Sequence, residues 1–302
     1  MIKSVLVIDD ERIQAESLAK SIKKEKVYLD CYVASEESEI LSSIENVFFN
    51  VAIVDLRMDN YKIDGFFIIN KILKVNPFAR IIIVSAYTQE YITQIKDILL
   101  TGKVIGLIEK KEYNQFLNEI LLAISKYEEV QSDNPSETAK ALTSFYANAK
   151  NEKDTYQKGI VFEQFAALLF SNMGFVNINK RILDKSQNEV DLVLRNELND
   201  FFFSKFSPYI LVECKNKQNE SVGKNDFIQF FTKLKNTNGL SNLGFLITTG
   251  YIARTTYIEA VRTSSDICKI VFLSNPEIER LINSPLPLNE LKKIIDEQVK
   301  DN

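Results

Sequence analysis

The stretch Val5-Leu6-Val7-Ile8-Asp9-Asp10-Glu11 is a run of four apolar residues that ends in three carboxylates. A short apolar run of this kind predicts a strand that is buried on both faces of a sheet. The pattern returns at Val51–Asp55, where four apolar residues again end in an aspartate. Polar residues that close buried parallel strands gather at one edge of the sheet. The two stretches therefore predict a parallel sheet whose edge carries Asp9, Asp10 and Asp55.

Residues 1–127 continue this alternation of apolar runs with amphipathic helical stretches. We expect strands at 4–8, 30–34, 51–55, 81–85 and 106–109, and helices near 11–24, 36–46, 64–75, 90–101 and 111–127. Short strands that alternate with helices predict an α/β fold with a parallel sheet and helices on both faces. Ser85 then ends the fourth strand and Lys110 follows the fifth, so both are expected at the edge that carries the aspartates.

This edge has the chemistry of a phosphoryl-acceptor site. Three clustered carboxylates repel one another unless a divalent cation is bound, and oxygen ligands favour Mg²⁺. A lysine and a hydroxyl suit the charge and the oxygens of a phosphoryl group. We therefore expect Asp9, Asp10 and Asp55 to bind Mg²⁺, and Ser85 and Lys110 to contact a phosphoryl group.

Residues 1–127 resemble a response-regulator receiver domain. The segments that carry the resemblance are Val5–Glu11, Val51–Asp55, Asp64-Gly65, Val84-Ser85-Ala86 and Gly106–Lys110. It implies a flavodoxin-like, five-stranded parallel (βα)5 fold. It also implies that Asp55 is the residue that becomes phosphorylated, and that a sensor histidine kinase is the phosphoryl donor.

One departure concerns the switch residue of the family. Leu107 occupies a position at which the family often has an aromatic residue. The coupling through Ser85 is therefore expected to differ from the usual pattern. The alternative for this domain is a receiver-like fold that is never phosphorylated.

The chain has 302 residues, which is enough for two domains. Residues 128–154 break the periodicity, and we interpret them as a partly helical linker. Residues 155–302 begin with a helix at 156–173 and continue as an α/β domain that opens with an antiparallel meander. Its strands are expected at 175–179, 189–194, 209–215, 244–248 and 269–273, and its later helices near 222–236, 253–263, 275–284 and 287–300.

The second domain carries charged residues inside apolar strands. Asp191 lies in the strand at 189–194, and Glu213 and Lys215 close the strand at 209–215. A spacing of two places Glu213 and Lys215 on one face of the strand. Buried charges are costly unless they are paired or bind a metal ion. Two carboxylates on adjacent strands suit Mg²⁺, and the lysine suits a water or a phosphate in phosphodiester cleavage.

This Asp…Glu-x-Lys pattern resembles the PD-(D/E)xK nuclease superfamily, and over residues 156–275 its Mrr-like restriction endonuclease branch. The supporting segments are Gly159–Phe165, Gly174-Phe175 and Gly244–Tyr251. The resemblance implies a restriction-endonuclease-like domain with a mixed sheet, in which Asp191 and Glu213 hold Mg²⁺ and Lys215 is catalytic. Mn²⁺ is expected to substitute for Mg²⁺, and DNA is the expected substrate. The alternative is a structural ion cluster.

Two further residues are auxiliary candidates for the nuclease site. Glu163 lies on a helical face with apolar neighbours, and we expect it to support the metal or a water; the alternative is an exposed helix residue. Gln229 on a later helix is expected to face the site or the phosphate backbone. The group Lys215, Asn216, Lys217 and Lys224 has two interpretations, a phosphate-backbone contact and a solvated loop.

Composition narrows the possible functions. The chain has no histidine, which excludes Ser-His-Asp triads, histidine-ligated metal sites and an internal phosphohistidine relay. Three scattered cysteines are too few for a disulfide framework. The net charge of −4 argues against a strongly basic nucleic-acid binder. No signal peptide and no long apolar run is visible, so a cytoplasmic location is expected.

Together these features predict a response regulator whose phosphorylation at Asp55 controls a Mg²⁺-dependent endonuclease. Homodimerisation through residues 90–127 would bring two nuclease domains together, whereas relief of inhibition in a monomer fits equally well. The alternative output is a restriction-endonuclease-like domain that binds DNA or a protein partner without cleavage.

Overall fold

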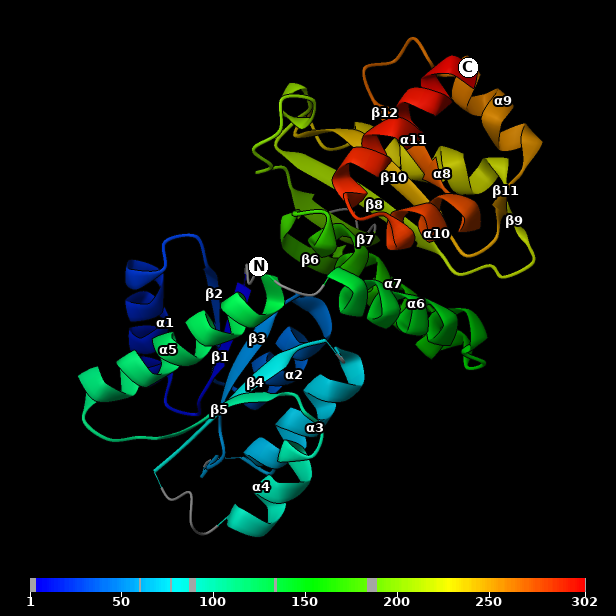
Figure 1. The fold of residues 1–302 in the computed structure, drawn as a ribbon. Helices are drawn as coiled ribbons and strands as arrows, with labels where there is room; N and C mark the ends of the chain where they lie inside the picture. The colour runs from blue at the N-terminus through cyan, green and yellow to red at the C-terminus, as the bar shows by residue number, and fades with distance from the viewer. Residues whose placement is uncertain are drawn as a thin grey trace. The chain divides into compact units, whose positions relative to one another are not determined.

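The computed structural model describes residues 4–59, 61–76, 78–86, 91–132, 135–183 and 189–301. The chain divides into two compact units, Met1–Asn134 and Pro135–Asn302. Each unit is described here by itself (Figure 1). Asp133 and Asn134, in the segment interpreted as a linker, lie outside the described residues.

The first unit is built on a parallel sheet with helices on both faces (Figure 1). The strand order is β2-β1-β3-β4-β5, and all neighbouring strands are parallel. This confirms the predicted fold class. Its elements are β1 (Ser4–Ile8), α1 (Arg12–Glu25), β2 (Asp30–Ala34), α2 (Glu37–Asn46), β3 (Val51–Asp55), α3 (Gly65–Val75), β4 (Arg80–Ser85), α4 (Ile92–Leu99), β5 (Val104–Glu109) and α5 (Tyr113–Ser132).

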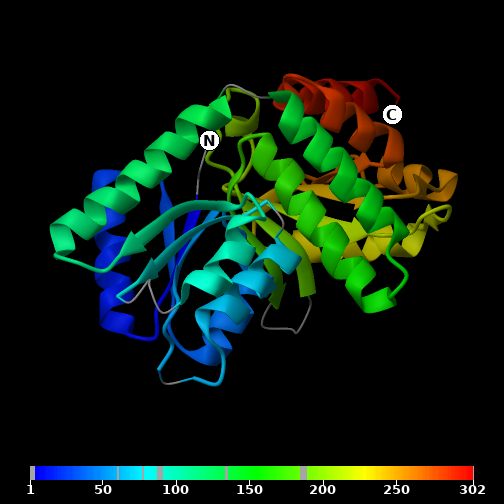
Figure 2. The same cartoon turned by 60° about the horizontal axis from the view of Figure 1, so that its bottom comes forward.

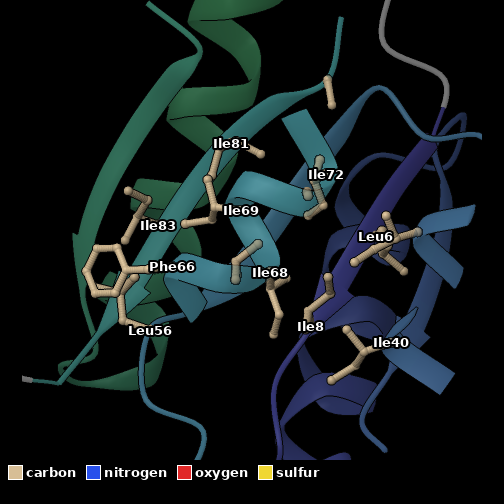
Figure 3. Close-up of a cluster of buried hydrophobic side chains, with 14 of the residues drawn as sticks. Leu6, Ile8, Ile40, Leu56, Phe66, Ile68, Ile69, Ile72, Ile81 and Ile83 are labelled. Atoms are coloured by element: carbon tan, nitrogen blue, oxygen red, sulfur yellow. The ribbon is translucent and has the colours of Figure 1, made fainter. Parts of the chain in front are cut away.

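Alternate residues of β1 face two helical layers. Leu6 and Ile8 belong to a core shared with α2, α3 and α4 (Figure 3). Val5 and Val7 belong to a second core shared with α1 and α5. Burial on both faces explains why this strand is continuously apolar in sequence. It also fixes the backbone immediately before Asp9.

Gly65 allows α3 to start against the end of β3. A Cβ atom at this position would lie 2.3 Å from the carbonyl oxygen of Asp55. The Gly65 N–H donates to the carbonyl oxygen of Leu56 at 3.1 Å. Asp64 caps the helix by accepting a hydrogen bond from the Phe67 N–H at 2.8 Å. The absence of a side chain at residue 65 therefore helps to position Asp55.

The second unit has a mixed sheet, which confirms the predicted class. The order is β12-β10-β8-β7-β6; β6, β7 and β8 pair antiparallel, and β8, β10 and β12 pair parallel. A small parallel sheet joins β9 to β11. The elements are α6 (Pro135–Asn151), α7 (Thr155–Asn172), β6 (Val176–Leu183), β7 (Glu189–Arg195), η2 (Phe203–Lys205), β8 (Tyr209–Lys215), β9 (Ser221–Val222), α8 (Lys224–Lys235), β10 (Ser241–Thr248), β11 (Tyr251–Ile252), α9 (Arg254–Arg262), β12 (Lys269–Leu273), α10 (Asn275–Asn283) and α11 (Pro287–Asp301).

Helices α7 and α8 pack on opposite faces of this sheet. Leu246 of β10 belongs to a core shared with Phe230 of α8. Its neighbour Phe245 points to the other face, where its ring centroid lies 5.2 Å from that of Phe170 on α7. The sheet edge that carries Glu213 thus has helices on both sides.

Helix α6 packs along α7 (Figure 2). Leu142, Tyr146 and Ala149 are buried. The Tyr146 ring centroid lies 4.7 Å from that of Phe165 on α7. The described residues 138–154 of the segment interpreted as a linker therefore contribute to the core of the second unit. Among the described residues, no helix combines the length and apolar character that crossing a membrane requires.

Two candidate functional sites

Lys110 joins two aspartates at the carboxyl edge of the first sheet. Its Nζ lies 2.7 Å from Oδ2 of Asp9 and 2.5 Å from Oδ2 of Asp55. Oδ1 of Asp9 accepts the Glu11 N–H at 2.9 Å, and Oδ1 of Asp55 accepts the Arg57 N–H at 3.2 Å. Each carboxylate is thus oriented by one backbone donor and by the same ammonium group.

The carboxylates of this edge are close enough to share a cation. Ligand oxygens of Asp9, Asp10 and Asp55 all lie within 4.8 Å of one another. Asp9 and Asp55 are buried, and Asp10 is half-buried. Burial raises the pKa of Asp55 and outweighs the attraction of Lys110. An all-oxygen set with costly negative charge fits a small hard cation such as Mg²⁺.

The electrostatics of Lys110 favour its charged form. Burial alone would lower its pKa, but Asp55 and Asp9 outweigh burial and raise the pKa above the usual value. The ammonium group therefore stays protonated at neutral pH. A charged lysine in this position can neutralise a phosphoryl oxygen.

Ser85 lies at the same edge. Its side chain is buried at the end of β4, in the strand pair where Val84 lies opposite Asp55. The Lys110 N–H donates to the Ser85 carbonyl oxygen at 3.0 Å, which ties the ends of β4 and β5 together. Leu107, the residue at the switch position, is 44% exposed on β5. An apolar side chain is thus open to solvent at that position.

In the second unit, two lysines hold Glu213. Oε1 of Glu213 lies 2.8 Å from Nζ of Lys215, and Oε2 lies 2.9 Å from Nζ of Lys233 on α8. Glu213 is buried, whereas the two lysines are partly open. Sequence reasoning missed Lys233. In the sequence, Lys233 stands out only by its position three residues after the buried Phe230 of α8. The sequence does not show that the Lys233 side chain reaches Glu213 on β8.

Asp191 lies on the strand next to Glu213. Its Oδ2 accepts the Cys214 N–H at 2.6 Å across the β7–β8 pair. Burial, with the nearby Glu213 charge, raises the pKa of Asp191 to about 7. Burial would lower the pKa of Lys215, but Glu213 outweighs it and raises that pKa. Asp191 and Glu213 are close enough for their charges to interact, and both offer carboxylate oxygens. A divalent cation bound between them would relieve this repulsion.

Glu163 sits beside this site in an ion pair. Its Oε2 accepts a hydrogen bond from Nε of Arg181 at 2.8 Å, and its side chain is 12% exposed. Burial raises the pKa of Glu163. Arg181 itself has a φ of 53°, in the left-handed region that non-glycine residues rarely adopt. The expected support of a metal or water by Glu163 therefore requires that Arg181 releases or shares this carboxylate.

The other candidates near the site have specific partners. Gln229 is exposed on α8, one turn before Lys233. Nζ of Lys217 lies 2.8 Å from Oδ2 of Asp226, and Nζ of Lys224 lies 3.0 Å from Oε2 of Glu259. Both lysines are thus neutralised by local carboxylates.

Comparison with known families matches both units. Residues 5–121 match the response regulator receiver domain family, and residues 157–282 match the Mrr_cat restriction endonuclease family. The chain joins a receiver domain to a restriction endonuclease domain. Residues 122–156, which include α6, lie outside both matched regions.

Solved structures similar to this chain include several receivers. A CheY-like receiver domain protein from Methanospirillum hungatei JF-1 is 24% identical, with a TM-score of 0.37 over 44% of this chain and 98% of the other. The receiver domain of Francisella response regulator 1452 is 22% identical, with a TM-score of 0.32 over 41% and 98%. Response regulator DrrB of Thermotoga maritima is 17% identical, with a TM-score of 0.33 over 43% and 54%. No curated protein matches the chain.

Proposed function

We propose that this chain is a two-component response regulator in which phosphorylation of Asp55 controls a Mg²⁺-dependent endonuclease that cleaves DNA. The observation that carries the proposal is the cluster of Asp191, Glu213 and Lys215 at one edge of the endonuclease sheet, with Lys233 beside it. The receiver supplies a second acidic site on the same chain.

In the receiver, Asp55 is the nucleophile. Its carboxylate oxygen forms a bond to phosphorus as the P–N bond of a phosphohistidine on a partner kinase breaks. Lys110, held 2.5 Å from Asp55, would then transfer its contact to a phosphoryl oxygen. Asp9, Asp10 and Asp55 would hold Mg²⁺, and Ser85 would bind the phosphoryl group.

In the endonuclease domain, Asp191 and Glu213 would hold the divalent cation. When bound, that cation supplies the charge that stabilises a developing negative phosphate and favours ionisation of water. Lys215 has a raised pKa, so it is charged at neutral pH and suits stabilisation of the phosphate better than removal of a proton. Lys233 adds a second positive charge on the other oxygen of Glu213.

Signal transfer through a receiver homodimer is part of the proposal. Within the described residues 91–127, Leu100 after α4 is 85% exposed and Leu122 on α5 is 53% exposed. Exposed apolar groups favour association between copies. Two associated chains would bring two endonuclease domains to one DNA duplex.

The alternative is an endonuclease-like domain that binds DNA or a protein partner without cutting. The observation that favours it is that each carboxylate oxygen of Glu213 already contacts a lysine. The same arrangement is expected of a structural ion cluster. In that case the lysines neutralise the buried acid and no cation is needed.

Plasmid cleavage tests these proposals. The full chain is incubated with supercoiled DNA and Mg²⁺ or Mn²⁺, with and without beryllofluoride, beside Asp55→Ala and Lys215→Ala. Cleavage that requires Lys215 and changes with beryllofluoride only when Asp55 is present supports the gated endonuclease. Equal cleavage by Lys215→Ala contradicts the assigned site, and no cleavage with intact phosphorylation favours the non-cleaving alternative.

A further inference from the structure

The residue after Lys215 ties three elements together. Nδ2 of Asn216 donates to the carbonyl oxygens of Ala149 at the end of α6, at 2.8 Å, and Lys158 in α7, at 2.9 Å. Its Oδ1 accepts a hydrogen bond from Oγ1 of Thr249 at 2.8 Å. An asparagine side chain has two N–H donors and one carbonyl acceptor, and each is used here.

A second connection runs from α6 to the neighbouring strand end. The Tyr146 hydroxyl and Nζ of Lys150 donate to Oδ1 of Asn275, at 2.8 and 2.9 Å. The Asn275 N–H donates to the carbonyl oxygen of Gly250 at 3.3 Å, and the Gly250 N–H donates to Oγ1 of Thr248 at 3.1 Å.

Both connections end beside the same catalytic candidate. Thr248 lies opposite Lys215 in the register of β10 with β8, and Asn216 is bonded to Lys215 through the peptide. Thr248 and Thr249 are buried. Helix α6 is thus hydrogen-bonded directly to the residue after β8, and through Asn275 and Gly250 to the end of β10.

Helix α6 follows the last helix of the receiver in the chain. In the sequence, two residues separate the end of α5 at Ser132 from the start of α6 at Pro135. Helix α6 lies outside both family matches, between the residues that match the receiver family and those that match the restriction endonuclease family. It is the first element of the second unit after the receiver.

We propose that Asn216 is a positioning residue that couples α6 to Lys215, and that α6 is the element through which the state of the receiver reaches the endonuclease site. This proposal rests on the proposed function, which makes Lys215 a catalytic residue. A shift of α6 moves the Ala149 carbonyl and so strains or breaks one of the three hydrogen bonds that hold the Asn216 side chain, since both of its N–H donors are already in use. Displacement of a catalytic group by about 1 Å costs on the order of a hundredfold in rate.

Hydrogen exchange on the full chain tests the coupling without any need for cleavage. Exchange is measured with and without Mg²⁺ and beryllofluoride for the wild type and Asn216→Ala. We expect beryllofluoride to change exchange in α6 in both proteins, and at the Lys217 amide, whose N–H donates to the Lys215 carbonyl oxygen, in the wild type only. No change in α6 of the wild type, or an undiminished change at residue 217 in the variant, overturns the proposal.

Two further variants keep the result interpretable. Asn216→Ala removes three hydrogen bonds and can unfold the domain, so Asn216→Asp is measured beside it. Asp keeps an acceptor for Thr249 and loses both N–H donors, and we expect it to lose the same exchange response. Asn283→Ala is the control, because Asn283 is exposed and its side chain donates to the Glu279 carbonyl oxygen of its own helix.

Cleavage kinetics give a second readout. We expect Asn216→Ala to lower kcat about tenfold or more, to keep KM within about twofold, and to lose its response to beryllofluoride. A wild-type response in this variant contradicts the coupling. A wild type that never cleaves contradicts the endonuclease function instead, and the exchange experiment still decides whether Asn216 transmits the signal.

Discussion

Lys233 of α8 and Glu213 of β8 form an ion pair of 2.9 Å, although they lie 20 positions apart in the chain. The pair places a second ammonium group on the carboxylate that Lys215 already contacts at 2.8 Å. Two lysines thus meet the buried Glu213 beside Asp191 at this strand end. The ammonium groups suit an approaching phosphate.

We expect Lys233→Met to lower the cleavage rate about a hundredfold to a thousandfold, because removal of one donor that stabilises transition-state charge has effects of this size. The measurement is kcat and KM on plasmid DNA. Lys235→Met is the matched control, since Lys235 lies on the same helix and pairs with Asp266 at 2.8 Å. Equal rates for Lys233→Met and the wild type would remove Lys233 from the site.

Divalent cations should stabilise the chain at two separable sites. A ligand at 100 times its Kd adds about 2.7 kcal/mol to the free energy of unfolding, which raises Tm by several degrees. We expect Asp10→Ala with Asp55→Ala to remove the receiver's share of the Mn²⁺-induced shift, and Asp191→Ala in that background to remove the rest. Thermal unfolding with and without Mn²⁺ measures both steps. A full shift that survives all three changes would mean that the cation binds elsewhere.

The pH dependence of stability should report on Asp191 in metal-free protein. Its pKa is raised from 3.8 to about 7 by burial, so between these values the folded state holds a proton that the unfolded state has released. The free energy of unfolding therefore falls as pH rises from about 4 to about 7, and this contribution is constant above that range.

We expect Asp191→Asn to flatten this part of the curve, because asparagine does not ionise. Urea unfolding in EDTA from pH 4.5 to pH 8.5 measures the effect against the wild type. Parallel curves for the two proteins would show that Asp191 does not titrate in this range.

Two glycines should respond oppositely to alanine. A Cβ at Gly65 would lie 2.3 Å from the Asp55 carbonyl oxygen, so Gly65→Ala should destabilise the receiver by about 1–3 kcal/mol or more. Gly159 lies within α7, where the nearest atom to a Cβ is Oε1 of Glu163 at 3.9 Å. Gly159→Ala should stabilise by about 0.5–1 kcal/mol through helix propensity. Chemical denaturation measures both, and loss of stability in Gly159→Ala would contradict the packing at α7.

The sequence alone located the strands of both five-stranded sheets and the residue types at their carboxyl ends, although β6 and β10 are longer than the predicted 175–179 and 244–248. Val51–Asp55 is a strand with the predicted bounds. Its continuous apolar run is buried on both faces of the sheet, as expected for a central parallel strand. The strand Tyr209–Lys215 also has its predicted bounds, and its period of two correctly placed Glu213 and Lys215 on one face. Local pattern sufficed because these features depend on neighbours within a few residues.

Only the tertiary structure decided which distant residues meet. The ion pair between Glu163 and Arg181 depends on how β6 packs against α7. The ion pair between Glu213 and Lys233 depends on how α8 packs on the sheet. The bonds of Asn216 to α6 and α7 depend on the packing of both helices beside β8. Such contacts join residues that share no local period, so their physical cause is the packing of whole elements rather than any stretch of sequence.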